Sequence, residues 1–207
     1  MLAAFELKTA ILFIALFAAS VFPALSQTKI LTDYEWQLSE PGRTMFRDRL
    51  PVGQIALVEG RKEKLTGELL QVLTDIAFIP GDSLRHFAAA FRIFEGERVY
   101  SEVIADAEEL PELIGAAKYI AETAVNIAST ERSETRITFR TRANLSLEFI
   151  QIGTQQQINI VMPDPLSDGE IIRTLSADQL KLFSDLLDLT IFELNRQGAN
   201  LVVETPK

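Results

Sequence analysis

The segment between Ser176 and Gly198 constrains the fold most, because its apolar stripe is too wide to be covered by a sheet alone. Ser176 and Gln179 form a capping-box pattern that predicts a helix start, and Gly198 is typical of the residue just past a helix end. Apolar residues occupy slightly more than half of the helix circumference: Leu180, Leu182, Phe183, Leu186, Leu187, Ile191 and Leu194. We therefore expect this helix to contact both a sheet and another helix.

A second amphipathic helix is predicted from about Pro111 to about Ala128, since a proline suits the first helical turn. Alanines line the middle of its apolar face: Ala117, Ala121, Ala124 and Ala128. Such small side chains let a neighbouring backbone come near. We expect another element to pack very closely on this alanine face.

Short apolar runs and alternating residues predict strands elsewhere in the chain. A hairpin is expected over 87–104 with a turn at Glu95-Gly96, and three later strands over about 135–142, 145–152 and 157–162. Three short strands with tight turns at Gly60, Thr74-Asp75 and Pro80-Gly81 are expected earlier, around 55–58 and 69–73. One helix over 62–77 is the alternative, and Gly67 favours strands.

These elements predict an α+β fold with antiparallel β-sheet and two amphipathic helices packed on one face. The expected order is several β-strands, a helix, three β-strands and a helix. We expect a single α+β domain over 51–200, preceded by a lead segment over 27–50 that is anchored by Trp36 or Phe46, and followed by a tail over 201–207. The halves resemble a duplicated topology without a sequence repeat.

Residues 1–26 have the pattern of a cleaved signal peptide. Lys8 precedes a run over 10–22 that is apolar except for Ser20, and small residues follow up to Ser26. That run is shorter than the roughly 20 residues a helix needs to cross a bilayer. We expect an extracytoplasmic protein, periplasmic or secreted, without a stable membrane span once residues 1–26 are removed.

Composition argues against several classes of function. The chain has no cysteine and one histidine, which excludes zinc, copper and haem sites of the usual kind, so no cofactor is expected. A calcium loop over 164–175 would have Asp164 and Asp168 as ligands but lacks two key ligands, at Leu166 and Leu175. The net charge of −9 repels nucleic acid at long range.

Gly81-Asp82-Ser83-Leu84 resembles the motif of a family of secreted serine esterases and lipases. In that family an Asp-x-x-His near the C-terminus supplies the base, whereas here the only histidine is His86, three residues after Ser83. A turn of adjacent residues rarely holds a nucleophile, a base and the group that orients the base. We therefore expect a tight turn at this motif, and no catalytic residue is assigned.

Arg136, Arg140 and Arg142 share one face of a predicted strand and suggest an anion site. A three-residue loop over 143–145 would instead place Arg140 opposite Glu148 and Phe139 opposite Phe149, which engages the middle arginine. Arg136 and Arg142 remain candidates for an interaction surface. So does Phe192, on the polar face of the last helix, although cover by the segment with Trp36 is the favoured interpretation.

These observations favour a non-catalytic exported domain that binds another protein or a cell-envelope component, with the ligand unidentified. The alternative is a carboxylate-dependent extracytoplasmic hydrolase, whose residues would come together only in three dimensions. A pocket with two convergent carboxylates, one with a raised pKa, would favour the enzyme. A shallow surface with an apolar patch would favour binding.

Overall fold

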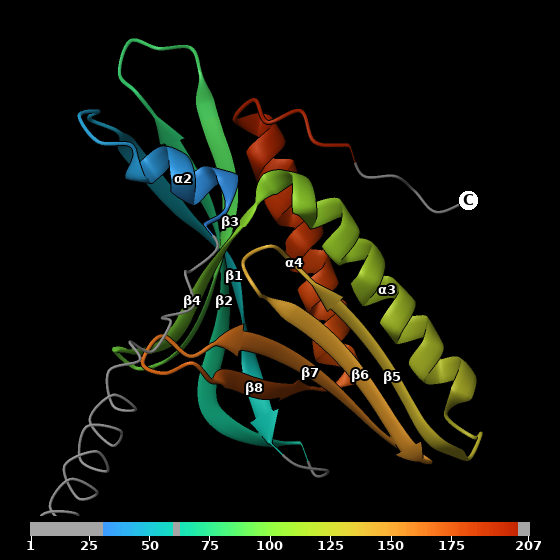
Figure 1. The fold of residues 1–207 in the computed structure, drawn as a ribbon. Helices are drawn as coiled ribbons and strands as arrows, with labels where there is room; N and C mark the ends of the chain where they lie inside the picture. The colour runs from blue at the N-terminus through green and yellow to red at the C-terminus, as the bar shows by residue number, and fades with distance from the viewer. Residues whose placement is uncertain (1–30, 60–62, 203–207) are drawn as a thin grey trace, which may run out of the picture.

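The fold was obtained as a computed structural model that describes residues 31–59 and 63–202 (Figure 1). The described elements are helices α2 (Asp33–Ser39), α3 (Leu110–Ile127) and α4 (Ala177–Arg196), and the strands β1 (Phe46–Glu59), β2 (Lys64–Phe78), β3 (Arg85–Glu95), β4 (Arg98–Asp106), β5 (Arg132–Arg140), β6 (Ser146–Gly153), β7 (Gln155–Pro163) and β8 (Glu170–Leu175). A short 3-10 turn, Ala107–Glu109, leads into α3. The α+β class is confirmed, with a mostly antiparallel sheet.

All eight strands form one sheet in the order β4-β3-β2-β1-β8-β7-β6-β5. Each half is an antiparallel meander of four strands followed by a helix, and the halves join at the pair Val58 and Thr174 of β1 and β8. The sheet bends so strongly that β4 returns to β7, where Ser101 Oγ donates to the Pro163 carbonyl at 2.7 Å. The inner faces of the two halves therefore enclose a common core.

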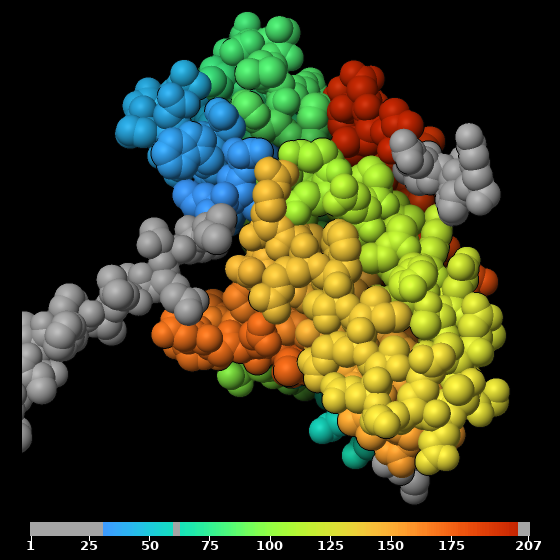
Figure 2. Space-filling model, turned by 45° about the vertical axis from the view of Figure 1, so that its right-hand side comes forward, coloured from blue at the N-terminus to red at the C-terminus, as the bar shows by residue number. Residues whose placement is uncertain are grey.

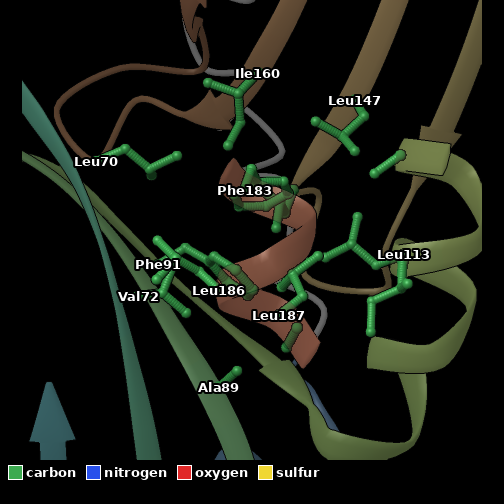
Figure 3. Close-up of a cluster of buried hydrophobic side chains, with 14 of the residues drawn as sticks. Leu70, Val72, Ala89, Phe91, Leu113, Leu147, Ile160, Phe183, Leu186 and Leu187 are labelled. Atoms are coloured by element: carbon green, nitrogen blue, oxygen red, sulfur yellow. The ribbon is translucent and has the colours of Figure 1, made fainter. Parts of the chain in front are cut away.

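Helices α3 and α4 close that core (Figure 1). Strand residues alternate between the faces of the sheet, so Val72, Ala89 and Phe91 point inward. Figure 3 shows Phe183 and Leu187 of α4 among side chains from both halves of the sheet. The Phe91 and Phe183 rings pack with centroids 5.9 Å apart. The expectation that α4 contacts both a sheet and a helix is confirmed.

Helix α2 covers the opposite face of the first half. Thr32 and Glu35 form its capping box, and Tyr34 packs on the small outward residues Ala77, Ala88 and Ala90. Two charged contacts hold it: the Tyr34 hydroxyl donates to Asp75, and Asp106 accepts the backbone N–H groups of Asp33 and Tyr34 at 3.0 and 2.8 Å. The arrangement of only two helices on one face is thus wrong, because a third helix lies on the other face.

Several predicted boundaries also differ from the structure. Two long strands, β1 and β2, replace the three short ones, since Thr74 and Asp75 are buried within β2 instead of forming a turn. Residues 27–50 include α2 and the start of β1, and the anchor is Tyr34, while Trp36 and Phe46 are 65% and 51% exposed. The second half has a fourth strand, β8, within residues 164–175, for which the sequence predicted no strand.

The remaining elements agree with the predictions. Segment 64–78 is a strand and not a helix, α3 and α4 begin and end within one or two residues of the expected positions, and the capping box of Ser176 and Gln179 is present. Within 31–59 and 63–202, no helix is both long and apolar enough to traverse a membrane. The predicted signal peptide over 1–26 and the turn at Gly60 lie outside the described residues.

Candidate functional site

A groove of about 650 Å³ separates the C-terminal half of α3 from the N-terminal half of α4. We call it the interhelical groove. The two helices run antiparallel (Figure 1). Gln156 and Ile158 of β7 also line the groove. Its apolar walls are built mainly from five alanines: Ala117, Ala121, Ala124 and Ala128 of α3, and Ala177 of α4. A concave, mostly apolar hollow of this size is typical of ligand sites.

The groove exists because side-chain size changes along the helix pair. Near its N-terminus α3 presents Leu110, Leu113 and Ile114, which are fully buried in the core with Leu187 and Leu194 of α4. Beyond Ala117, Ile120 is still buried in the core, but the residues that line the groove there are mostly alanines, which are too small to fill the same space. The alanine face is therefore only partly packed: Ala124 is buried, Ala121 is half-buried and Ala128 is exposed.

Ser184 contributes a buried polar group to the wall formed by α4. Its side chain is 6% exposed, and its hydroxyl has no hydrogen-bond partner among the described residues. A buried hydroxyl without a partner costs about 1–3 kcal/mol, so such groups are uncommon away from functional sites. Ser184 is the feature of the groove wall that packing alone does not explain.

Two glutamines join the end of α3 to the sheet beside the groove. Gln156 Nε2 donates to the Ala124 carbonyl at 2.8 Å, and Gln151 Nε2 donates to the carbonyls of Ile127 and Thr130 at 3.3 and 2.7 Å. The bond from Gln156 engages a carbonyl in the last turn of α3, where carbonyls lack partners within the helix. A further hollow of about 380 Å³ adjoins the groove here and shares Ala124, Gln156, Ile158 and Ala177 with it.

The mouth of the groove is charged. Lys118 of α3 pairs with Asp188 of α4, with Nζ 3.5 Å from Oδ2. Lys181, Asp178 and Asp185 also line the groove, and no ion pair engages them within the part of the chain described here. Apart from the paired residues, the mouth thus has two carboxylates and one ammonium group.

A second, polar hollow of about 330 Å³ lies beside α2 and contains the carboxylates of Asp33, Asp106 and Glu108. Oxygens of these three residues lie within 4.8 Å of one another, close enough to hold a cation or to perform acid–base chemistry. Burial raises the pKa of the Asp106 carboxyl against the opposing effect of its hydrogen bonds. This pocket is the arrangement expected of the hydrolase alternative.

The three carboxylates of this hollow, which we call the carboxylate pocket, are already paired with Arg142. Its guanidinium lies 2.8 Å from Asp33, 3.0 Å from Asp106 and 2.6 Å from Glu108, and Figure 2 shows the β5–β6 loop reaching toward α2. Its hydrogen bond to Glu108 and the other nearby carboxylates raise the Arg142 pKa. Asp106 meanwhile uses both oxygens to cap α2. The cluster is accounted for as the joint that fixes α2.

A charged network supports the same face of the sheet. Asp75 is fully buried and accepts hydrogen bonds from Tyr34, Arg47 and Arg49. Burial and the Asp75 hydrogen bond raise the Tyr34 pKa, and the bond to Asp75 raises the Arg47 pKa. Each charge in this network has a partner, so we interpret it as structural.

The proposed arginine register is wrong. Arg140 lies opposite Ser146, not Glu148, because residues 141–145 form a longer loop closed by the Thr141 N–H donating to the Leu145 carbonyl. The observed register differs from the predicted one by two residues, and an even shift leaves each side chain on the same face, so Ile137 and Phe139 still face the core. Arg140 contacts Ser146 and Glu170. Since Arg136 pairs with Glu134 at 3.7 Å and Arg142 is held by carboxylates, the three arginines do not converge on one site.

Phe192 is 61% exposed on α4, so the segment with Trp36, which was expected to cover it, does not do so, and Trp36 is itself 65% exposed on α2. Ser83 lies in the exposed β2–β3 turn, which follows Pro80-Gly81 as predicted, and no hydrogen bond among the described residues joins Ser83 to His86. In the β7–β8 turn, Asp164 accepts the N–H of Leu166 and the hydroxyl of Ser167, which lower its pKa.

The sequence interpretation had identified the alanine face but not the groove. The position of Ser184 within the buried stripe of α4 was a readable sign, since a serine there interrupts apolar neighbours. Nothing in the sequence around Lys181 indicated that this residue lines a groove. Thr32 and Glu35 formed a capping box that would have predicted α2. Comparisons with protein-family models, curated proteins and solved structures gave no match for this chain.

Proposed function

We propose that the protein is a non-catalytic binding protein that holds an apolar part of another protein or of a cell-envelope component in the interhelical groove. The single observation that supports this most is the groove itself: an apolar hollow of about 650 Å³ with a buried, unpartnered hydroxyl at Ser184. Phe192 lies seven residues beyond Asp185, or about two turns along α4, so an exposed apolar side chain continues the groove side of the helix.

We further propose that the binding takes place outside the cytoplasm, after removal of residues 1–26. The signal-peptide pattern of the sequence supports this location. The intact mass of the exported protein should correspond to residues 27–207. A full-length mass in the membrane fraction would contradict it.

Hydrolysis at the carboxylate pocket is the second candidate, supported by the raised pKa of the Asp106 carboxyl. It is the weaker one because Arg142 and the start of α2 use the carboxylate oxygens that a substrate or a water would need. The groove, in contrast, needs no rearrangement to accept a ligand.

Nile red, a neutral apolar dye, tests whether the groove binds an apolar ligand. We expect blue-shifted emission with the folded protein and loss of most of it in Ala121→Phe, which fills the groove. Asn126→Phe is the matched control, because it puts the same ring on an exposed position of α3 outside the groove lining. Equal dye binding by both variants, or none by the parent protein, would refute the proposed function.

A further inference from the structure

We infer that the occupant of the interhelical groove is a basic amphipathic helix of a partner protein, an inference that rests on the proposed function. The walls of the groove are two antiparallel helices, and its alanines extend from Ala117 to Ala128. At a rise of about 1.5 Å per residue this is about 16 Å, the length of three helical turns. A third helix laid along the groove would contact α3 and α4 together.

The side chains of the groove set the kind of helix that fits. The separation between packed helices depends on the side chains at the contact, and alanines at 4-3-4 spacing allow a near approach along one stripe. Ala121 and Ala124 leave room for residues of leucine or alanine size on the partner. The Ser184 hydroxyl, buried in the wall, would gain the partner it lacks from a carbonyl or polar side chain of the bound helix.

Charge selects a basic partner over an anionic lipid. Asp178 and Asp185 lie at the mouth of the groove. Of the two lysines that line the groove, Lys118 is paired with Asp188, and Lys181 has no ion pair among the residues described. The whole chain has a net charge of −9. Lysine or arginine residues beside the apolar stripe of a partner helix would lie against these two carboxylates. An anionic headgroup at the same place, or a second copy of this acidic chain, would be repelled.

A labelled synthetic peptide of about 16 residues tests this inference. Its sequence would form a helix with a Leu/Ala stripe flanked by lysines, and a matched peptide would have glutamate in place of each lysine. We expect fluorescence anisotropy to show binding of the lysine peptide at least about tenfold tighter than that of the glutamate peptide, with affinity falling as salt rises. Binding of the two peptides with equal affinity would overturn the inference.

Protein variants locate the peptide. Ala121→Phe should weaken lysine-peptide binding about tenfold or more, whereas Asn126→Phe should not. Asp178→Asn with Asp185→Asn should weaken it and flatten its salt dependence. The control for charge is Asp48→Asn with Asp168→Asn, which removes two carboxylates from exposed positions on β1 and in the β7–β8 turn. Equal losses in both double variants would contradict a contact at the groove mouth.

Two further measurements separate this inference from the proposed function. If Nile red binds in the groove and the lysine peptide does not, the helix inference is wrong while the proposed function stands. If a fluorescent long-chain fatty acid binds and is lost in Ala121→Phe while the peptide fails, the occupant is a lipid chain. If light scattering shows a dimer that Ala121→Phe dissociates, the occupant is a second copy, and the inference is likewise overturned.

Discussion

The guanidinium of Arg142 lies 3.0 Å from the buried carboxylate of Asp106, joining the β5–β6 loop to the end of β4. The same carboxylate caps the start of α2 through the N–H groups of Asp33 and Tyr34. One ion pair thus connects three segments that are far apart in the sequence. Arg142, initially a candidate for anion binding, has its guanidinium committed to this joint.

Replacing Arg142 with methionine should therefore destabilise the fold. The change leaves Asp106 buried beside Glu108 without a cation, and we expect a loss of about 1–3 kcal/mol in the free energy of unfolding, moderated by the partial exposure of Arg142. Urea denaturation measures the loss, and hydrogen exchange over 33–39 should quicken. Arg136→Met, which removes an exposed arginine paired only with Glu134, should cost less than about 0.5 kcal/mol. Equal losses would contradict the assignment.

Gly53 of β1 packs against the side chain of Leu186 of α4. A Cβ added to Gly53 would overlap Leu186 Cδ2, so Gly53→Ala should cost about 1–3 kcal/mol by overpacking. Leu186→Ala alone should cost about 2–5 kcal/mol. The double variant should lose clearly less than the sum of the two, as measured by chemical denaturation. Additive losses would mean that the two residues do not meet.

Two buried serines should respond oppositely to the same change. Ser101→Ala removes the hydrogen bond that joins β4 to β7, and should lower the free energy of unfolding by about 1 kcal/mol. Ser184→Ala removes a hydroxyl without a partner and should leave stability unchanged or raise it. Thermal and urea denaturation of the two variants check this contrast. A loss at Ser184 as large as at Ser101 would show that its hydroxyl is bonded.

Glu102 provides a stabilisation that depends on pH. Its burial opposes ionisation, but hydrogen bonds from Arg49 and Arg92 outweigh burial and lower its pKa below the ordinary 4.5. The stabilisation is then complete above that value and is lost as pH falls through the lowered pKa. Glu102→Gln should be less stable than the parent near neutral pH, and the gap should narrow at about pH 3. A gap that is constant with pH would contradict this.

Local sequence patterns predicted the elements in which buried apolar residues recur at regular spacing. α3, α4 and the β3–β4 hairpin have apolar periods and terminal residues that agree, so sequence alone located them. β2 was cut short because Thr74 and Asp75 suggest a turn, and only the distant Tyr34, Arg47 and Arg49 make a buried aspartate tolerable there. β8 was missed because its half-buried residues form no clear alternation.

The candidate site was harder to predict than the fold. Alanine spacing on α3 indicated a near approach, but whether another element fills that face depends on where α4 and β7 end up. The predicted β5–β6 register was wrong for a related reason: it assumed a three-residue loop, whereas Thr141 closes a loop of five residues. The alternation of residues along the strand predicted which face of the sheet each side chain is on, but it did not predict which residue lies opposite on the neighbouring strand.

The most direct test of the interhelical groove as a ligand site is a methyl NMR titration with Nile red, on protein labelled with ¹³C at alanine methyl groups. We predict shifts at Ala121, Ala124, Ala128 and Ala177, which line the groove, and none at Ala88, Ala89 and Ala90, which are buried in β3. Ala121→Phe should abolish the shifts. Perturbation of the β3 alanines alone, or no alanine shift at saturating dye, would contradict a ligand site between α3 and α4.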